Sequence, residues 1–181
     1  MASMWRDAPA SVRPMLATTA SAPLDSTEFV YEPKYDGIRA IAAIDSPKPR
    51  LWSRLGNEKT AQFPEVAAAL EKWGRRLDRP VVVDGEVVAL DAHGEPAGFQ
   101  NLQRIHMNAE RPAAERGVAF IVFDILRDGD EDLRPLPLRQ RRARLEALFA
   151  GTRDSHLRIS EQAVGDGREM HSRAQAGGWE G

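Results

Sequence analysis

The sequence contains no cysteine, which excludes disulfide bonds and thiolate metal sites and fits an intracellular protein. It has no apolar run close to the ~20 residues that a membrane-spanning helix needs. Its first residues, MASMWRDAPAS, lack the basic and then apolar pattern of a secretory signal. We therefore expect a soluble, cytoplasmic protein with no membrane partner.

A strong net charge is also missing. The 25 lysine and arginine residues and the 27 aspartate and glutamate residues leave a formal net charge of −2. Because both signs are interspersed, no strong field favours nucleic acid or a membrane surface, and any contact with nucleic acid has to come from a local patch. The chain also has no G-x-x-x-x-G-K-[ST] loop, which argues against a P-loop nucleotide-binding enzyme.

The chain is nevertheless long and apolar enough to fold. Its 181 residues, 42% of them hydrophobic, can bury a core, and we expect one globular unit. Residues 1–27 are rich in proline, alanine, serine and threonine and have weak periodicity, which predicts an extended lead-in segment. The folded domain is expected to cover residues 28–181.

Apolar periodicity predicts an α+β fold. Alternating or continuous apolar stretches predict strands at residues 28–33, 38–45, 50–54, 81–90, 118–126 and 156–160. Helical spacing predicts helices at residues 63–73, 99–106, 137–150 and 165–175. The turn sequence SPKP, residues 46–49, predicts an antiparallel pair of strands on its two sides. Since strands mostly neighbour strands, we expect a mixed or antiparallel sheet flanked by helices.

Lysine is scarce, with four lysines against 21 arginines. One of the four, Lys34, lies in the stretch EPKYDGIR, between Glu32 and Asp36. A surface that needs only positive charge would more often carry arginine in this chain. Lysine differs in that it can lose its proton near neutral pH and then act as a nucleophile. Lys34 is therefore a candidate nucleophile, although so short a pattern more often marks a surface lysine in a turn.

Four short motifs in a fixed order resemble those of the covalent nucleotidyltransferases, which are ATP-dependent DNA ligases, RNA ligases and mRNA capping enzymes. The motifs K-x-D-G-x-R, S-R-x-G, D-G-E and F-D-x-L match residues 34–39, 53–56, 84–86 and 123–126. FQNLQRIH at residues 99–106 and PLRQRRARLEAL at residues 137–148 are similar to bacterial ATP-dependent DNA ligases, including the ligase modules used in end joining. The resemblance runs from about residue 15 to the C-terminus.

The resemblance implies an adenylation domain of the ATP-grasp-like nucleotidyltransferase fold. In its first step Lys34 would attack the α-phosphate of ATP, expel pyrophosphate and hold AMP through a phosphoramidate bond, with Mg²⁺ or Mn²⁺ as the metal. Nearby cations, the metal and partial burial would have to lower the pKa of the lysine, because a protonated amine cannot attack. The adenylated lysine would then serve the joining of nicked or broken double-stranded DNA in repair.

The resemblance also implies residues that bind the nucleotide. Glu32 is suited to the adenine and ribose end, and Arg54 to ribose or phosphate. Arg39 offers a planar fork for phosphate. Glu86 would accept a hydrogen bond from a ribose hydroxyl or help to hold the metal. Phe123 would stack on the adenine ring, a role that needs only an aromatic face.

Each of these residues has a plainer interpretation. Phe123 lies in an apolar run and would be a core residue by default. Asp84-Gly85 could form a turn or bulge that leaves Glu86 facing solvent, and Arg54 could be an ordinary surface residue. Only the joint order of the motifs favours the functional interpretation. A further group of arginines could touch a DNA backbone, but a solvated helix face is the commoner use of Arg139, Arg141, Arg142 and Arg144.

Asp36 and Glu180 are the candidate metal ligands. Mg²⁺ asks for only one or two carboxylates beside substrate phosphates, which Asp36 suits. Glu180 and Gly181 match an E-G pair whose glutamate helps to place metal and phosphate in the family. A lysine-bearing element and an OB-type domain follow in the family and are missing here. We therefore expect an adenylation domain that is incomplete at its C-terminus and does not seal nicks alone.

Two other functions stay open at this point. The chain could be a non-catalytic module that keeps the nucleotide pocket without forming the covalent adduct. It could also be an RNA ligase or a guanylyltransferase of the same fold. Competition between ATP and GTP for labelling of the lysine discriminates between the transferases.

Overall fold

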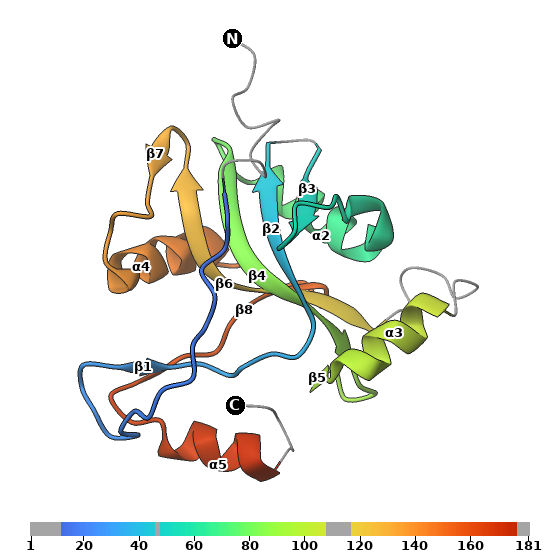
Figure 1. The fold of residues 1–181 in the computed structure, drawn as a ribbon. Helices are drawn as coiled ribbons and strands as arrows, with labels where there is room; N and C mark the ends of the chain where they lie inside the picture. Colours follow the sequence, from blue (N-terminus) through green and yellow to red (C-terminus); the bar gives the residue numbers. More distant parts are fainter. Residues whose placement is uncertain (1–11, 46–47, 108–116, 177–181) are drawn as a thin grey trace.

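A seven-stranded sheet lies at the centre of the protein (Figure 1). The structure is a computed structural model that describes residues 12–45, 48–107 and 117–176. In order across the sheet, the strands are β3 (Arg50–Ser53), β2 (Ile38–Ile44), β4 (Val81–Leu90), β6 (Val118–Asp128) and β7 (Glu131–Asp132), with β5 (Pro96–Ala97) beside β4 and β8 (Leu157–Ile159) beside β6.

The sheet is mixed, as the sequence predicts. Its strand pairs are antiparallel except for β6 and β8, which are parallel. The predicted antiparallel pair on either side of residues 46–49 is confirmed as β2 and β3, in which Ala40 faces Ser53. Strand β4 runs without a break through Asp84-Gly85-Glu86. The two-residue strands β5 and β7 escaped prediction because an alternating pattern needs about four residues to be seen.

Three helices pack on one face of the sheet. They are α2 (Pro64–Gly74), α3 (Phe99–Met107) and α4 (Leu138–Phe149), and a short 3₁₀ helix, η1 (Thr60–Gln62), precedes α2. Their apolar side chains form one core with alternate residues of β2, β4 and β6. Trp73 of α2 contacts Phe149 of α4 with ring centroids 4.6 Å apart. The helices predicted at residues 63–73, 99–106 and 137–150 are confirmed.

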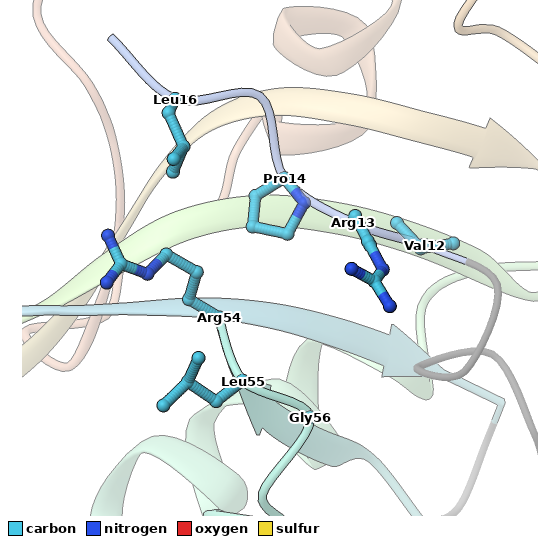
Figure 2. A pocket seen from close by; sticks show the side chains of 7 residues that line it. All are labelled: Val12, Arg13, Pro14, Leu16, Arg54, Leu55 and Gly56. Atoms are coloured by element: carbon cyan, nitrogen blue, oxygen red, sulfur yellow. The ribbon is translucent and has the colours of Figure 1, made fainter.

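The opposite face of the sheet carries two smaller apolar clusters. One joins β2, β3, β4 and β6 to Val12 of the N-terminal segment. The other lies further along β4 and β6 and packs against Tyr35. Residues 12–29 contain no helix or strand. The start of this segment, residues 12–16, borders a cavity of about 710 Å³ together with the turn after β3 (Figure 2). The sheet surface between the two clusters is where the motif residues meet.

A second, two-stranded sheet pairs β1 (Val30–Tyr31) with β9 (Ala163–Val164), and α5 (Arg168–Ala176) follows (Figure 1). The sequence predictions were too long here. The strand predicted at residues 28–33 keeps two residues, and the helix predicted from residue 165 begins at Arg168. Gly165 has φ of +80°, and a Cβ on Gly167 would overlap the Tyr31 ring. Both glycines therefore belong to a turn packed on β1.

No helix in the described ranges is long and apolar enough to cross a membrane.

Candidate functional site

Lys34 lies on the connection between β1 and β2, and its side chain is exposed. We call residues 32–37 the lysine loop. The Asp36 carboxylate accepts a hydrogen bond from the backbone N–H of Phe99, the first residue of α3, at 2.9 Å. The Ser160 hydroxyl lies 3.4 Å from the Tyr35 hydroxyl. These contacts anchor the loop to two other parts of the fold, so the backbone that carries Lys34 has a defined position.

Gly37 fixes the end of the lysine loop against β4. Its backbone N–H donates a hydrogen bond to the Glu86 carboxylate. A Cβ at this position would overlap the carbonyl oxygen of Val87. Only glycine therefore allows the loop and β4 to approach this closely.

Replacing Gly37 by alanine is expected to lower the free energy of unfolding by about 2 kcal/mol, because the loop has to move away from β4 to make room. The displacement should also slow any reaction of Lys34. Urea unfolding measures the first effect. The matched control is Gly98→Ala, whose Cβ would lie 3.2 Å from a side-chain oxygen of Asp36 and meet no backbone atom that closely, so it should cost under about 1 kcal/mol. Equal losses in the two variants would contradict the steric argument.

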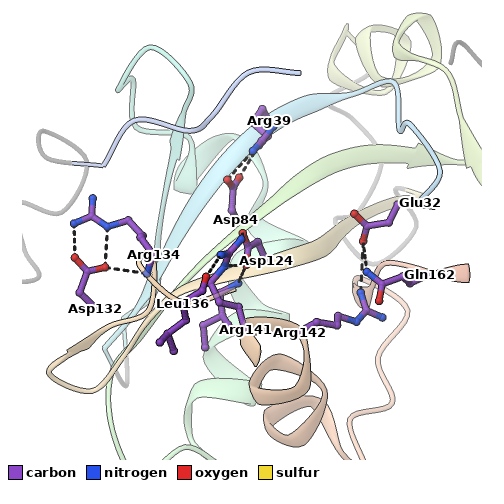
Figure 3. A network of polar contacts seen from close by, with 11 residues as sticks. Glu32, Arg39, Asp84, Asp124, Asp132, Arg134, Leu136, Arg141, Arg142 and Gln162 are labelled. Atoms are coloured by element: carbon purple, nitrogen blue, oxygen red, sulfur yellow. Dashed lines mark hydrogen bonds and ion pairs between the residues drawn. The ribbon is translucent and has the colours of Figure 1, made fainter. Parts of the chain in front are cut away.

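Arg39, Asp84 and Glu86 point to the same face of the sheet. The β2–β4 register pairs Arg39 with Glu86, and side chains two residues apart along β4 share a face. Arg39 donates two hydrogen bonds to Asp84, from Nε to Oδ1 at 2.6 Å and from Nη2 to Oδ2 at 2.7 Å (Figure 3). Asp84 is 3% exposed, so this fork supplies the positive partner that a buried carboxylate needs.

Burial raises the pKa of both carboxyl groups on this face. The pKa of Asp84 is raised because the loss of solvent outweighs the hydrogen bonds and charge of Arg39. Burial raises the pKa of Glu86 to about 7, against the opposing charge of Arg39 and the N–H of Gly37. Glu86 is thus a group that changes charge near neutral pH.

Replacing Glu86 by glutamine is expected to stabilise the protein at pH 8 by about 1–2 kcal/mol, after allowance for partial exposure. The pKa of Glu86 is about 7 when folded and near its ordinary 4.5 when unfolded. The stability that this group contributes is therefore lost as the pH rises from about 4.5 through 7. Glutamine carries no charge and avoids that loss. Urea unfolding should show the gain at pH 8 and little gain at pH 5; a loss at pH 8 would refute the assignment.

Phe123 is the extra residue of a β-bulge. Asp84 pairs with Asp124, but the residue after Asp84 pairs with Val122, so Phe123 has no partner in register. Its side chain is half-buried, and the guanidinium carbon of Arg39 lies 4.6 Å from its ring centroid. It belongs to none of the core clusters of the described residues. The interpretation of Phe123 as a core residue is therefore wrong, because the bulge turns the ring toward Arg39.

Three of the four arginines on α4 pair with groups inside the protein. Arg141 donates to both carboxylate oxygens of Asp124 at 2.8 Å. Arg144 contacts the buried Asp128 at 2.7 Å, and Arg142 is itself only 8% exposed. The prediction of a solvated helix face is wrong for these three, because carboxylates near the end of β6 and in the lysine loop attract them. Ion pairs and hydrogen bonds of these arginines therefore hold α4 against the sheet, together with its apolar contacts.

Glu32 begins the lysine loop and has two partners on one oxygen. The side-chain amide of Gln162 donates to Oε1 at 3.5 Å, and Nη1 of Arg142 lies 3.7 Å from the same atom (Figure 3). Burial raises the pKa of Glu32, and the charge of Arg142 opposes the rise. The side chain is 29% exposed, so part of the carboxylate faces solvent.

Arg54 lies beside the cavity between the N-terminal segment and the turn after β3, to which Arg13 brings a second guanidinium group (Figure 2). Ser53 pairs with Ala40, so Arg54 follows at the level of Arg39 on the neighbouring strand. Within the described part of the chain, no hydrogen bond or ion pair joins Arg54 to the Arg39–Asp84 pair. The structure therefore places Arg54 at the edge of the sheet face that carries Arg39, Asp84 and Glu86. This polar face holds the Arg39–Asp84 hydrogen bonds, in which Arg54 takes no part.

Asp36 is the candidate metal ligand that the structure describes, and Glu180 lies outside the described residues. Over residues 12–45, 48–107 and 117–176, no group of three or more histidine, aspartate or glutamate side chains could hold a metal ion. The hydrogen bond from Phe99 uses only Oδ2 of Asp36. A single carboxylate with one oxygen outside that bond fits an ion such as Mg²⁺ that takes most of its ligands from water and phosphate.

Sequence reasoning missed the partners that hold the site. The motifs include Asp84 and Asp124, but no role was predicted for either residue. Arg141 and Arg142 were predicted to lie on a solvent-exposed helix face. One signal was available for Arg142, which is three and seven residues before the core residues Leu145 and Phe149. That spacing places it on the buried side of the helix.

The fold is similar to solved structures of ligases. Mycobacterial DNA ligase D complexed with ATP and MES is 33% identical, with a TM-score of 0.74 over 93% of this chain and 52% of that one. The ligase domain of LigD from Mycobacterium tuberculosis is 31% identical, with the same TM-score and similar coverage. Together with the motif-bearing lysine loop, this likeness defines the class of the protein as a covalent nucleotidyltransferase.

Sequence comparison identifies the family within that class. The chain belongs to the ATP dependent DNA ligase domain family, whose model matches residues 14–177. It is 36% identical over 173 residues to the multifunctional non-homologous end joining protein LigD of Pseudomonas aeruginosa, and 38% identical over 178 residues to a DNA ligase of Haloarcula marismortui. These matches cover 96% and 94% of this chain but 20% and 31% of the relatives. The resemblance seen in the motifs is confirmed.

Proposed function

We propose that this chain accepts AMP from ATP on Lys34, as the first step of DNA strand joining. One observation carries the proposal. The N–H of Gly37 holds the lysine loop to Glu86, on the sheet face where Arg39 and the bulged Phe123 lie. In the proposed site, the lysine works beside the carboxylate, guanidinium and aromatic ring that lie near the start of β2.

The reaction is a displacement at phosphorus. The unprotonated Nζ of Lys34 attacks the α-phosphorus of ATP, and a P–N bond forms. The bond from that phosphorus to the oxygen shared with the β-phosphate breaks, and pyrophosphate leaves with the electron pair. The proton of the amine passes to solvent, which reaches the exposed side chain. The product is AMP bound to lysine through a phosphoramidate.

The polar face supplies groups for the nucleotide. Phe123 stacks on the adenine, and Glu32 accepts a hydrogen bond at the nucleoside end. Glu86 accepts a hydrogen bond from a ribose hydroxyl when it is ionised. Arg39, held by its fork, adds a fixed positive charge near the phosphates, and Arg54 contributes a second at the edge of the face.

Asp36 and Glu180 are the residues that we propose to hold Mg²⁺ or Mn²⁺. When bound, such an ion neutralises charge on the phosphates. We further propose that residues 28–181 form the adenylation domain and that residues 1–27 lead into it.

The matched relatives are named as DNA ligases and end-joining proteins, and this chain spans less than a third of the length of the Pseudomonas LigD and of the Haloarcula ligase. By extension, the substrate of the whole protein is nicked or broken double-stranded DNA, clasped with the help of an OB-type domain. The family membership favours this over an RNA ligase or a guanylyltransferase.

Intact-mass measurement after incubation with ATP and Mg²⁺ tests the proposal. The expected result is an AMP-sized increment that peptide mapping places on Lys34, with no increment from GTP. Nucleotide binding without an increment would support a non-catalytic module instead. A GMP-sized increment would support a guanylyltransferase.

A further inference from the structure

Arg142 is a buried arginine whose contacts lead from α4 to the lysine loop. Its Nε donates to Glu146 at 2.7 Å, and its Nη2 donates to the carbonyl oxygen of Ser160 at 2.7 Å. Its Nη1 is buried, makes no hydrogen bond within the described residues and lies 3.7 Å from Oε1 of Glu32. Two bonds therefore fix the guanidinium, and its third nitrogen is turned toward Glu32 (Figure 3).

Packing alone does not account for an arginine at this position. Arg142 lies on the side of α4 that carries Leu145 and Phe149 into the core, where an apolar side chain would fit the pattern. A guanidinium buried to 8% exposure needs an anionic partner to offset the loss of its water. The side chain of Glu146 is 56% exposed and compensates weakly, whereas that of Glu32 is 29% exposed. Glu32 is thus the anionic partner that best compensates the buried charge of Arg142.

The same arginine reaches the lysine loop by a second route. Ser160, whose carbonyl oxygen accepts from Arg142, brings its hydroxyl to 3.4 Å from the hydroxyl of Tyr35. Tyr35 directly follows Lys34, and Glu32 lies two residues before Lys34. Arg142 is therefore linked to the loop on both sides of the proposed nucleophile.

We propose that Arg142 is a positioning residue that holds the Glu32 carboxylate, fixed and ionised, as a hydrogen-bond acceptor for the nucleoside end of ATP. This role rests on the proposed function of the lysine loop. An ionised carboxylate accepts hydrogen bonds on both oxygens, and a protonated one loses part of that capacity. Burial and the charge of Asp124 raise the pKa of Glu32, while Arg142 and the amide of Gln162 oppose them. Without Arg142, only the weaker effect of the Gln162 amide holds the pKa of Glu32 down.

The test is the rate of adduct formation as a function of pH and ATP concentration. In Arg142→Met, the KM for ATP should rise about tenfold with a smaller change in kcat, because a charge-assisted contact to the nucleotide is loosened. The step that Glu32 contributes to the acid limb of kcat/KM, below the step of Glu86, should move up by about one pH unit. Arg142→Lys should restore part of both effects. In a Glu32→Gln background, Arg142→Met should move the limb no further.

The matched control is Arg144→Met on the same helix, which removes an ion pair with Asp128 and should leave the acid limb in place. If Arg142→Met fails to fold, Arg142→Gln is used in its place, because glutamine keeps a donor for the carbonyl oxygen of Ser160. An unchanged KM and acid limb would overturn the proposal and leave Arg142 as a packing residue.

Carbon-13 NMR titration of Glu32 separates this proposal from the proposed function. A higher pKa of Glu32 in Arg142→Met than in the wild-type protein supports the positioning role without any nucleotide, and an equal pKa counts against it. Failure of the wild-type protein to form an adduct would instead count against the function of Lys34.

Discussion

The Lys34→Arg protein is expected to form no lysine–AMP adduct after exposure to ATP and Mg²⁺, a loss of at least about 10³-fold in rate. Arginine keeps the positive charge on a slightly longer side chain but stays protonated at any pH that the fold survives. The substitution therefore removes the nucleophile and little else. Intact-mass measurement over time gives the rate for each protein.

The stability of the variant should not change, because Lys34 is exposed. A difference within about 0.5 kcal/mol by urea unfolding would show that the loss is chemical and not structural. Lys48→Arg is the matched control, since it exchanges another exposed lysine outside the motif, and it should label at the wild-type rate. Labelling of Lys34→Arg at the same rate, or of another lysine, would refute the assignment.

The strands and helices that the sequence predicted well are those with long patterns. Strands β4 and β6 are nearly continuous runs of β-branched and apolar residues, and α2 and α4 carry apolar residues at helical spacing over three turns. β1 was predicted too long because its two paired residues depend on β9, more than 130 positions away. Pairing at that distance leaves no mark on the local pattern.

The sequence predicted which residues make up the candidate site, but not which contacts they make with one another. The motifs name Arg39, Glu86 and Phe123, but the stacking of Arg39 on Phe123 requires the bulge in β6. The bulge is a property of the register between two strands, and neither strand encodes it alone. The same holds for Asp84, whose burial and fork depend on β2 lying beside β4.

Replacing Arg39 by methionine is expected to lower the free energy of unfolding by about 3 kcal/mol at pH 8, because the buried Asp84 loses its positive partner. Burial already raises the pKa of Asp84, and loss of Arg39 raises it further. The folded variant therefore holds a proton that the unfolded chain releases above its ordinary pKa of 3.8. The stability contributed by that proton is lost as the pH rises, so the deficit should be smaller at pH 5 than at pH 8.

Arg50 provides the matched control, because it also lies over an aromatic ring, that of Trp52, and pairs with a carboxylate, Glu58. The side chain of Glu58 is 48% exposed against 5% for Asp84, so Arg50→Met should cost under about 1 kcal/mol. Equal losses in the two variants would mean that burial of Asp84 does not govern the effect.

The double variant Arg39→Met with Asp84→Asn separates stability from chemistry. Asparagine removes the buried charge, so the double variant should regain about half of the lost stability, and its remaining deficit should depend little on pH. It should not regain adduct formation, because the guanidinium that lies over Phe123 is still missing. Recovery of both stability and labelling would show that Arg39 only shields Asp84; recovery of stability alone would place the guanidinium in the reaction with ATP.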